Sequence, residues 1–143
     1  MVRNQSRPDL AEMLAELARK TVAAEQPVLA AHGLSMWGYI VLIALDRSPI
    51  RTQAALAEAI GADKTRIIPT LDELQQQGYI DRIPDPDDRR ARLLEITESG
   101  RSIKNTVRAA IQHGEERWLG QLATDDRDAF LRALQQLSGR FAD

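Results

Sequence analysis

The chain has 143 residues, of which 43% are hydrophobic and 28% charged, so we expect one globular domain. Its 19 Lys and Arg against 21 Asp and Glu give a formal net charge of -2, which excludes a polycationic coat but not a few well-placed arginines. With no cysteine, a disulfide framework, thiolate catalysis and cysteine redox sensing are excluded. The polar N-terminus lacks a signal peptide and no apolar run reaches the roughly 20 residues of a membrane span, so we expect a cytoplasmic protein without membrane contact.

The first predicted helix begins near Pro8, whose missing N–H costs nothing in a first turn. Pro27 is expected to kink or end this helix because it removes a backbone donor, and Gly33 is a plausible stop. The spacing i, i+4, i+7 places three leucines on one stripe: Leu10, Leu14 and Leu17. Residues 36–45 are almost continuously apolar, and their length after a capping Ser35 predicts a buried second helix.

Two short helices are predicted next, and together they form a helix-turn-helix candidate. The first spans residues 52–61, where Thr52 caps and Gly61 terminates an alanine-rich segment. The second starts at about Asp63 and is closed by Gly78. Its predicted buried side consists of Ile67, Leu71 and Leu74.

A charged hairpin is predicted directly after these helices. Residues 80–83 and 92–97 are strand-like, and residues 84–91 between them form a turn-rich, highly charged tip. A hairpin in this position relative to a helix-turn-helix is a wing.

Two helices complete the chain, a long one capped by Thr97 and ending at about Leu122, and a last one beginning at residues 124–126. The last helix carries an apolar stripe made of Phe130, Leu134, Leu137 and Phe141. Stripes at both ends of the chain exceed what a winged-helix module of about 60 residues needs to bury. We therefore expect a homodimer interface, the alternative being that the stripes pack within one chain.

The order of elements, with residues 74–100, resembles the MarR family of winged helix-turn-helix transcriptional regulators. Residues 74–100 contain LQQQGYIDR, then DRR in the wing and ITESG after it, close to the family pattern. Ala91, where many members have Gly, and Pro69 in the second helix depart from that pattern. The resemblance implies a mainly α fold with a small β-hairpin wing, and a winged helix-turn-helix joined to a helical dimerisation region.

The resemblance also sets the expected domain organisation and function. Residues 1–143 form a single MarR-like domain, with the DNA-binding lobe at 35–97 and the dimerisation region at 8–33 and 98–143. The implied function is a sequence-specific regulator of transcription that needs no cofactor and is not an enzyme. It is expected to be a ligand-responsive repressor that binds a pseudo-palindromic operator in double-stranded DNA as a homodimer.

The predicted DNA contacts lie on the second helix of the motif and on the wing. They are Lys64, Thr65, Arg66, Pro69, Arg82, Asp88, Arg89, Arg90 and Arg92. The first turn of a recognition helix usually enters the major groove, where Lys or Arg can reach guanine or phosphate. A Thr hydroxyl can reach phosphate, and an apolar surface such as that of proline can contact a thymine methyl group. The family pattern assigns Arg90 to the minor groove and Asp88 to bracing the wing. Arg89 and Arg92 are candidate phosphate contacts, with Arg82 a second-rank one.

The alternative for the helix is a solvated polar surface without DNA contact. For the wing, the alternative is a solvated turn whose arginines pair with Asp85, Asp87 and Asp88. Family members often respond to small aromatic or anionic ligands in a cleft between the dimerisation helices and the DNA-binding lobe. The candidate lining residues are His32, Met36, Trp37 and His113. A plain core role for Met36 and Trp37 is the alternative.

Two other classes of function remain open at this point. One is a winged helix that binds protein partners and leaves its DNA surface idle. The other is a metal-dependent enzyme, for which the only signal is His113 and Glu116 at i, i+3 on a helix, and we expect no metal site there.

Overall fold

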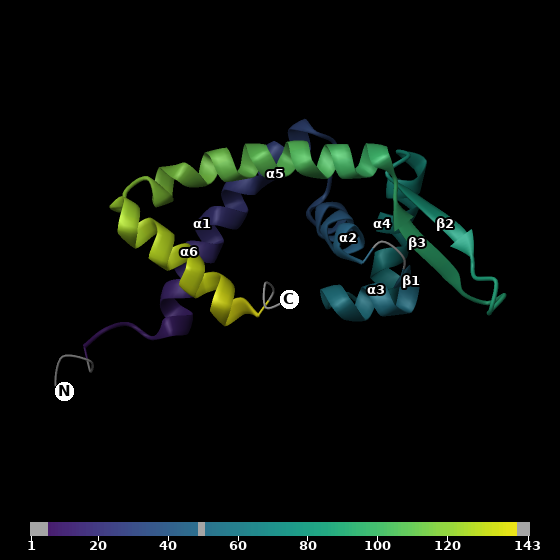
Figure 1. Cartoon of the computed structure of the whole chain (residues 1–143), viewed down its shortest axis with the longest axis horizontal. Helices are drawn as coiled ribbons and strands as arrows, with labels where there is room; N and C mark the ends of the chain where they lie inside the picture. The colour runs from purple at the N-terminus through teal and green to yellow at the C-terminus, as the bar shows by residue number, and fades with distance from the viewer. Residues whose placement is uncertain (1–5, 49–50, 140–143) are drawn as a thin grey trace.

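The computed structural model describes residues 6–48 and 51–139 and confirms the predicted fold class, mainly α with a small hairpin (Figure 1). The elements are α1 (Leu10–Ala31), α2 (Met36–Arg47), β1 (Arg51–Thr52), α3 (Gln53–Ile60), α4 (Lys64–Gln76), β2 (Ile80–Pro84), β3 (Arg92–Ile96), α5 (Glu98–Leu119) and α6 (Thr124–Ser138). In Figure 1, α5 runs along the top of the molecule, with α1 and α6 at one end and the strands at the other. In the described residues no single helix is long and apolar enough to cross a membrane, and only the pair α1 and α2, bent by 88°, passes that test together.

Of the two predicted effects of Pro27, a kink or an end of the helix, the structure excludes the end, because α1 continues to Ala31. Pro27 lies on the exposed side of the helix. Water can satisfy a carbonyl that loses its partner there, so the proline is tolerated. The chain then turns at Gly33, which has a φ of 67° and is followed by the buried Leu34.

Helix α2 is the centre of the hydrophobic core, as its continuous apolar sequence predicts. Ser35 caps it by accepting a hydrogen bond from the Gly38 amide at 2.9 Å. Val41, Leu42 and Leu45 are fully buried. The predicted inner side of α4 packs into the same core, which fixes the other face of α4 toward solvent.

The helix-turn-helix forms as predicted. Thr52 accepts a hydrogen bond from the Ala55 amide at 3.1 Å, and Gly61 ends α3 in the left-handed region at φ 70°. The wing is part of a three-stranded antiparallel sheet of order β1-β3-β2. Strand β1 was not predicted, because two residues carry no alternation that a pattern could detect. It joins the wing to the residue that caps α3.

The junction between the wing and α5 is closed by Thr97. Its amide donates to the Tyr79 carbonyl at 3.0 Å and its hydroxyl to the Gly78 carbonyl at 2.7 Å. The same hydroxyl oxygen accepts from the Gly100 amide at 3.0 Å and so caps α5. We call this set of contacts the Thr97 clasp. Gly100 is buried beneath it, and a Cβ built there would lie 2.1 Å from the Tyr79 carbonyl oxygen.

A second tie, between α2 and α5, centres on Asp46. Its carboxylate accepts a hydrogen bond from Arg101 Nε at 2.8 Å and forms an ion pair with Lys104, a lysine that is only 5% exposed. Arg101 first, and then Lys104, hold the pKa of Asp46 below its ordinary value. The native state therefore gains stability from ionised Asp46 above the pKa of an unfolded aspartate and loses it as the pH falls through the lowered value.

Helix α5 ends at Leu119, three residues before the predicted Leu122, which lies in the turn to α6. Helix α6 starts at Thr124 as predicted, but none of its described residues is buried. The terminal helices and the turn expose large apolar side chains, namely Leu10, Met13, Leu14, Val22, Leu122, Leu134 and Leu137. Phe141, the last member of the predicted stripe, lies outside the described residues.

Candidate nucleic-acid interface

The first turn of α4 is capped and exposed. Asp63 Oδ1 accepts hydrogen bonds from the Thr65 amide and the Thr65 hydroxyl, both at 3.0 Å. The predicted contacts Lys64, Thr65 and Arg66 are all exposed and follow this cap directly. The structure differs from the prediction at Thr65 in one respect. Its hydroxyl, expected to reach phosphate, is already engaged by Asp63, which leaves its methyl group as the free part of the side chain.

Pro69 and Ile68 lie on the exposed part of the same helix. Pro69 is the sixth residue of α4 and so lies beyond the first turn. Only within the first turn would a missing N–H cost nothing. Ile68 is 39% exposed and was not among the predicted contacts. The sequence offered one signal for it, an apolar residue outside the i, i+4, i+7 stripe that forms the core.

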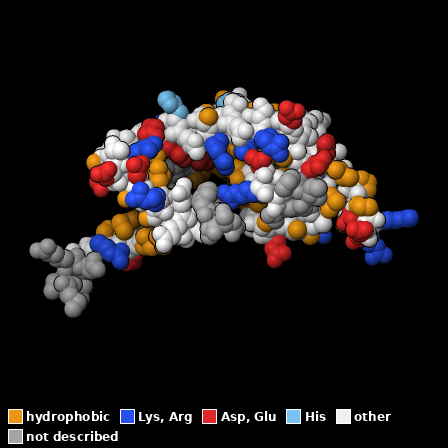
Figure 2. Space-filling view, in the orientation of Figure 1, with side chains coloured by type: hydrophobic (Ala, Val, Ile, Leu, Met, Phe, Trp, Pro, Cys, Tyr) orange, Lys and Arg blue, Asp and Glu red, His pale blue; other side chains and the backbone are white. Residues whose placement is uncertain are grey.

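The wing tip is organised by its aspartates, which bind backbone rather than arginine. Asp88 Oδ1 accepts from the Arg90 amide at 3.0 Å, and Asp85 Oδ1 accepts from the Asp87 amide at 2.9 Å. Within residues 51–139 no ion pair joins these carboxylates to the wing arginines Arg89, Arg90 and Arg92, all of which are exposed. Figure 2 shows basic side chains projecting from the wing end of the molecule.

Arg82 lies between the wing and α4. Its Nη1 donates to Asp72 Oδ1 at 2.5 Å and to Gln75 Oε1 at 3.0 Å, and its side chain is 17% exposed. A guanidinium held in this way ties β2 to α4. These contacts assign Arg82 to positioning the wing, and its role as a phosphate contact stays a prediction. Asp72 is a positioning residue that the sequence did not reveal.

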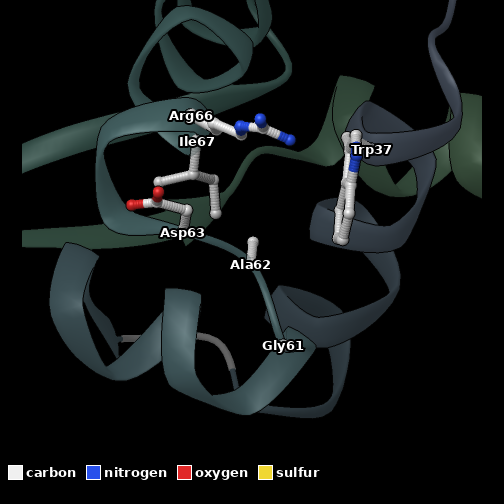
Figure 3. A pocket seen from close by; sticks show the side chains of 6 residues that line it. All are labelled: Trp37, Gly61, Ala62, Asp63, Arg66 and Ile67. Atoms are coloured by element: carbon white, nitrogen blue, oxygen red, sulfur yellow. The ribbon is translucent and has the colours of Figure 1, made fainter.

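The predicted effector residues do not gather in one place. A pocket of about 310 Å³ lies between the start of α2, the turn after α3 and the first turns of α4 (Figure 3). Its lining comprises Trp37, Gly61, Ala62, Asp63, Arg66 and Ile67, and of the four predicted effector residues it contains Trp37 alone. In Figure 3 the Arg66 guanidinium points toward Trp37, whereas the Asp63 carboxylate points away from it.

The other three candidates lie elsewhere. His32 Nδ1 is 2.8 Å from the Val28 carbonyl oxygen within α1 and its C-terminal turn. Met36 is partly buried against the core, and His113 is exposed on α5. In the part of the chain that the structure describes, no group of three or more His, Cys, Asp or Glu could hold a metal ion.

Known proteins resemble both the helix-turn-helix with its wing and the whole fold. A MarR family model matches residues 32–91, which run from the end of α1 to the wing tip. The wild-type apo form of MarR from E. coli superposes with a TM-score of 0.84 at 18% identity, covering 92% of this chain and 98% of that one. The transcriptional repressor CouR, bound to a 23-mer DNA duplex, gives a TM-score of 0.76 at 27% identity, covering 91% and 92%. Residues 32–91 match the MarR family, and the whole fold is that of solved MarR-family structures.

A curated relative of this chain is the HTH-type transcriptional regulator YybA of Bacillus subtilis (strain 168). The two are 25% identical over 99 residues, which are 69% of this chain and 66% of YybA. Family and fold are those of transcriptional regulators, which are not enzymes, and this sets aside the metal-dependent enzyme.

Proposed function

We propose that this protein is a sequence-specific repressor that binds a pseudo-palindromic operator as a homodimer and responds to a small ligand. The observation that carries DNA binding is the wing tip, where the carboxylates of Asp85 and Asp88 are occupied by backbone amides. The exposed arginines beside them remain available for phosphate or a minor groove, next to a recognition helix that starts with Lys64 and Arg66. CouR, a transcriptional repressor bound to a DNA duplex, supports the same function here.

Arg90→Ala should weaken binding to a selected duplex by about 1–3 kcal/mol and reduce the salt slope by about one per contact, because a cation near phosphate releases counterions. The measurement is a fluorescence-anisotropy titration across a salt series. Arg90→Lys is the matched control, since it retains the charge and should retain the slope while losing affinity. An Arg90→Ala protein with wild-type affinity and slope, and an unchanged circular dichroism spectrum, would contradict this role.

The same titration separates the proposal from its rival. A winged helix that only binds protein partners would show no salt-dependent affinity for any duplex selected from a random pool. A repressor of the proposed kind should instead select two related half-sites about one DNA turn apart, because a two-fold dimer presents two recognition helices at that spacing.

For the ligand response we assign the pocket beside Trp37 in place of the expected cleft between the dimerisation helices and the DNA-binding lobe. Trp37 is 45% exposed and offers an aromatic face, and Arg66 offers a cation to a carboxylate or phenolate. A ligand bound there would engage the side chain of Arg66, which the DNA-facing turn of α4 contributes to the pocket. It would therefore favour the DNA-free state, as any effector that relieves binding must.

Salicylate should quench the fluorescence of a Trp118→Phe protein, in which Trp37 is the remaining tryptophan. Arg66→Ala in that background should weaken salicylate binding at least several-fold, because it removes the charge-assisted hydrogen bond. Arg47→Ala, a cation loss outside the pocket lining, is the control. Equal salicylate affinity for the Arg66→Ala protein, or a DNA complex undisturbed by saturating salicylate, would mean that this pocket is not the effector site.

A further inference from the structure

Helix α4 carries an apolar patch in the middle of its exposed face. The side opposite its buried residues is formed, at i, i+4, i+7 and i+11, by Thr65, Pro69, Asp72 and Gln76, all exposed. Ile68 lies three residues after Thr65 and Pro69 lies four residues after it, so Thr65 adjoins each of the other two side chains on the helix surface. We call Thr65, Ile68 and Pro69 the α4 apolar patch.

The Thr65 side chain contributes its methyl group to this patch. Its hydroxyl donates to Asp63 Oδ1 at 3.0 Å, the carboxylate oxygen that also caps the Thr65 amide. The cap therefore holds the polar end of the side chain toward the N-terminus of α4. A hydroxyl used in this way has no proton left to donate to a base edge, whereas the methyl group remains free to contact one.

The position of Pro69 inside α4 is unfavourable for helix stability. As the sixth residue of α4 it removes a helical hydrogen bond, which costs about 3 kcal/mol in a regular helix interior. It also disfavours the helical conformation of the preceding residue, here the β-branched Ile68. Pro69 and Ile68 are both exposed, so burial in this chain does not offset that cost. A residue that disfavours its own helix, on a surface where burial does not compensate, is expected at a site where that surface binds a partner.

We propose that the α4 apolar patch reads the 5-methyl group of thymine in the major groove. This proposal rests on the proposed DNA binding and assigns the base that α4 selects. The thymine methyl is the apolar feature of the major-groove edge, and apolar side chains contact it. Asp72 lies on the same face, and its pairing with Arg82 at 2.5 Å offsets a negative charge that would otherwise approach phosphates.

The experiment replaces single thymines of the selected duplex by deoxyuridine, which pairs identically and lacks only the methyl group. For the wild-type protein, one or two positions per half-site should lose affinity about fourfold, the factor that ~0.8 kcal/mol per buried methyl gives. In the Pro69→Ala and Ile68→Ala proteins, replacing thymine by deoxyuridine at those positions should change the affinity little or not at all. Gln76→Ala, on the same face but at the far end of α4, is the matched control and should retain the full loss.

The outcomes separate this inference from the proposed function. If the wild-type protein binds duplex DNA with salt dependence but deoxyuridine is neutral at every thymine, the α4 apolar patch does not read methyl groups. The same follows if the loss persists unchanged in both patch variants. If the wild-type protein shows no salt-dependent affinity for any duplex, the proposed DNA binding is itself refuted and the inference fails with it.

Discussion

Gly100→Ala should destabilise the protein by about 3 kcal/mol or more, since the added methyl group meets a backbone atom that cannot move alone. The Cβ would lie 2.1 Å from the Tyr79 carbonyl oxygen and 3.0 Å from Ile96 Cγ1. That carbonyl is held by the Thr97 amide at 3.0 Å, so relief of the clash has to open the Thr97 clasp. Urea denaturation followed by circular dichroism measures the loss as a lower midpoint.

Gly114→Ala is the control for Gly100→Ala, because Gly114 lies in the same helix and a Cβ there meets nothing within 4 Å. It should leave the protein unchanged or stabilise it by up to ~1 kcal/mol, the difference in helix propensity between glycine and alanine. If the two variants unfold at the same urea concentration, close packing at Gly100 does not limit the residue there.

Leu137→Glu should convert the proposed homodimer into a monomer and lower operator affinity about 100-fold or more, because a monomer loses the second, linked half-site. Leu137 is 77% exposed in the single chain, so a charge there costs little unless a partner covers it. Sedimentation velocity at micromolar concentration reports the oligomeric state, and anisotropy reports DNA binding. The expected monomer should keep its helical circular dichroism spectrum.

Gln136→Glu is the control for the dimer, since it adds the same charge beside Leu137 but off the stripe formed by Phe130, Leu134 and Leu137. It should sediment as the wild-type protein does. A wild-type chain that is monomeric at micromolar concentration, or a Leu137→Glu protein that remains dimeric, would overturn the proposed interface on α6.

The elements that the sequence predicts well are those whose signals are local. Ser35, Thr52 and Thr97 cap the helices that follow them, and Gly61 ends α3, because each acts within a few residues. That α1 does not end at Pro27 could not be predicted, because the effect of a proline depends on its exposure, which the sequence does not state. Strand β1 escaped detection because it pairs with β3, some 40 positions away in the chain.

The candidate site shows the same division. The exposed positions of Lys64, Arg66 and Arg90 follow from periodicity and turn chemistry. The partner of Arg82 does not, because Asp72 lies ten residues away on another element. Trp37 and Arg66 are 29 positions apart, and only the packing of α2 against the helix-turn-helix makes them line one pocket.

The sheet order β1-β3-β2 has a consequence for the shape of the DNA. Strand β3 is bonded on one side to the residue that caps α3 and on the other to β2, which Arg82 ties to α4. The recognition helix and the wing are therefore held at a set separation. In the proposed complex the duplex has to adapt to that separation. Base steps between the two contact points, touched by no side chain, should then be selected for how easily they bend or narrow the groove.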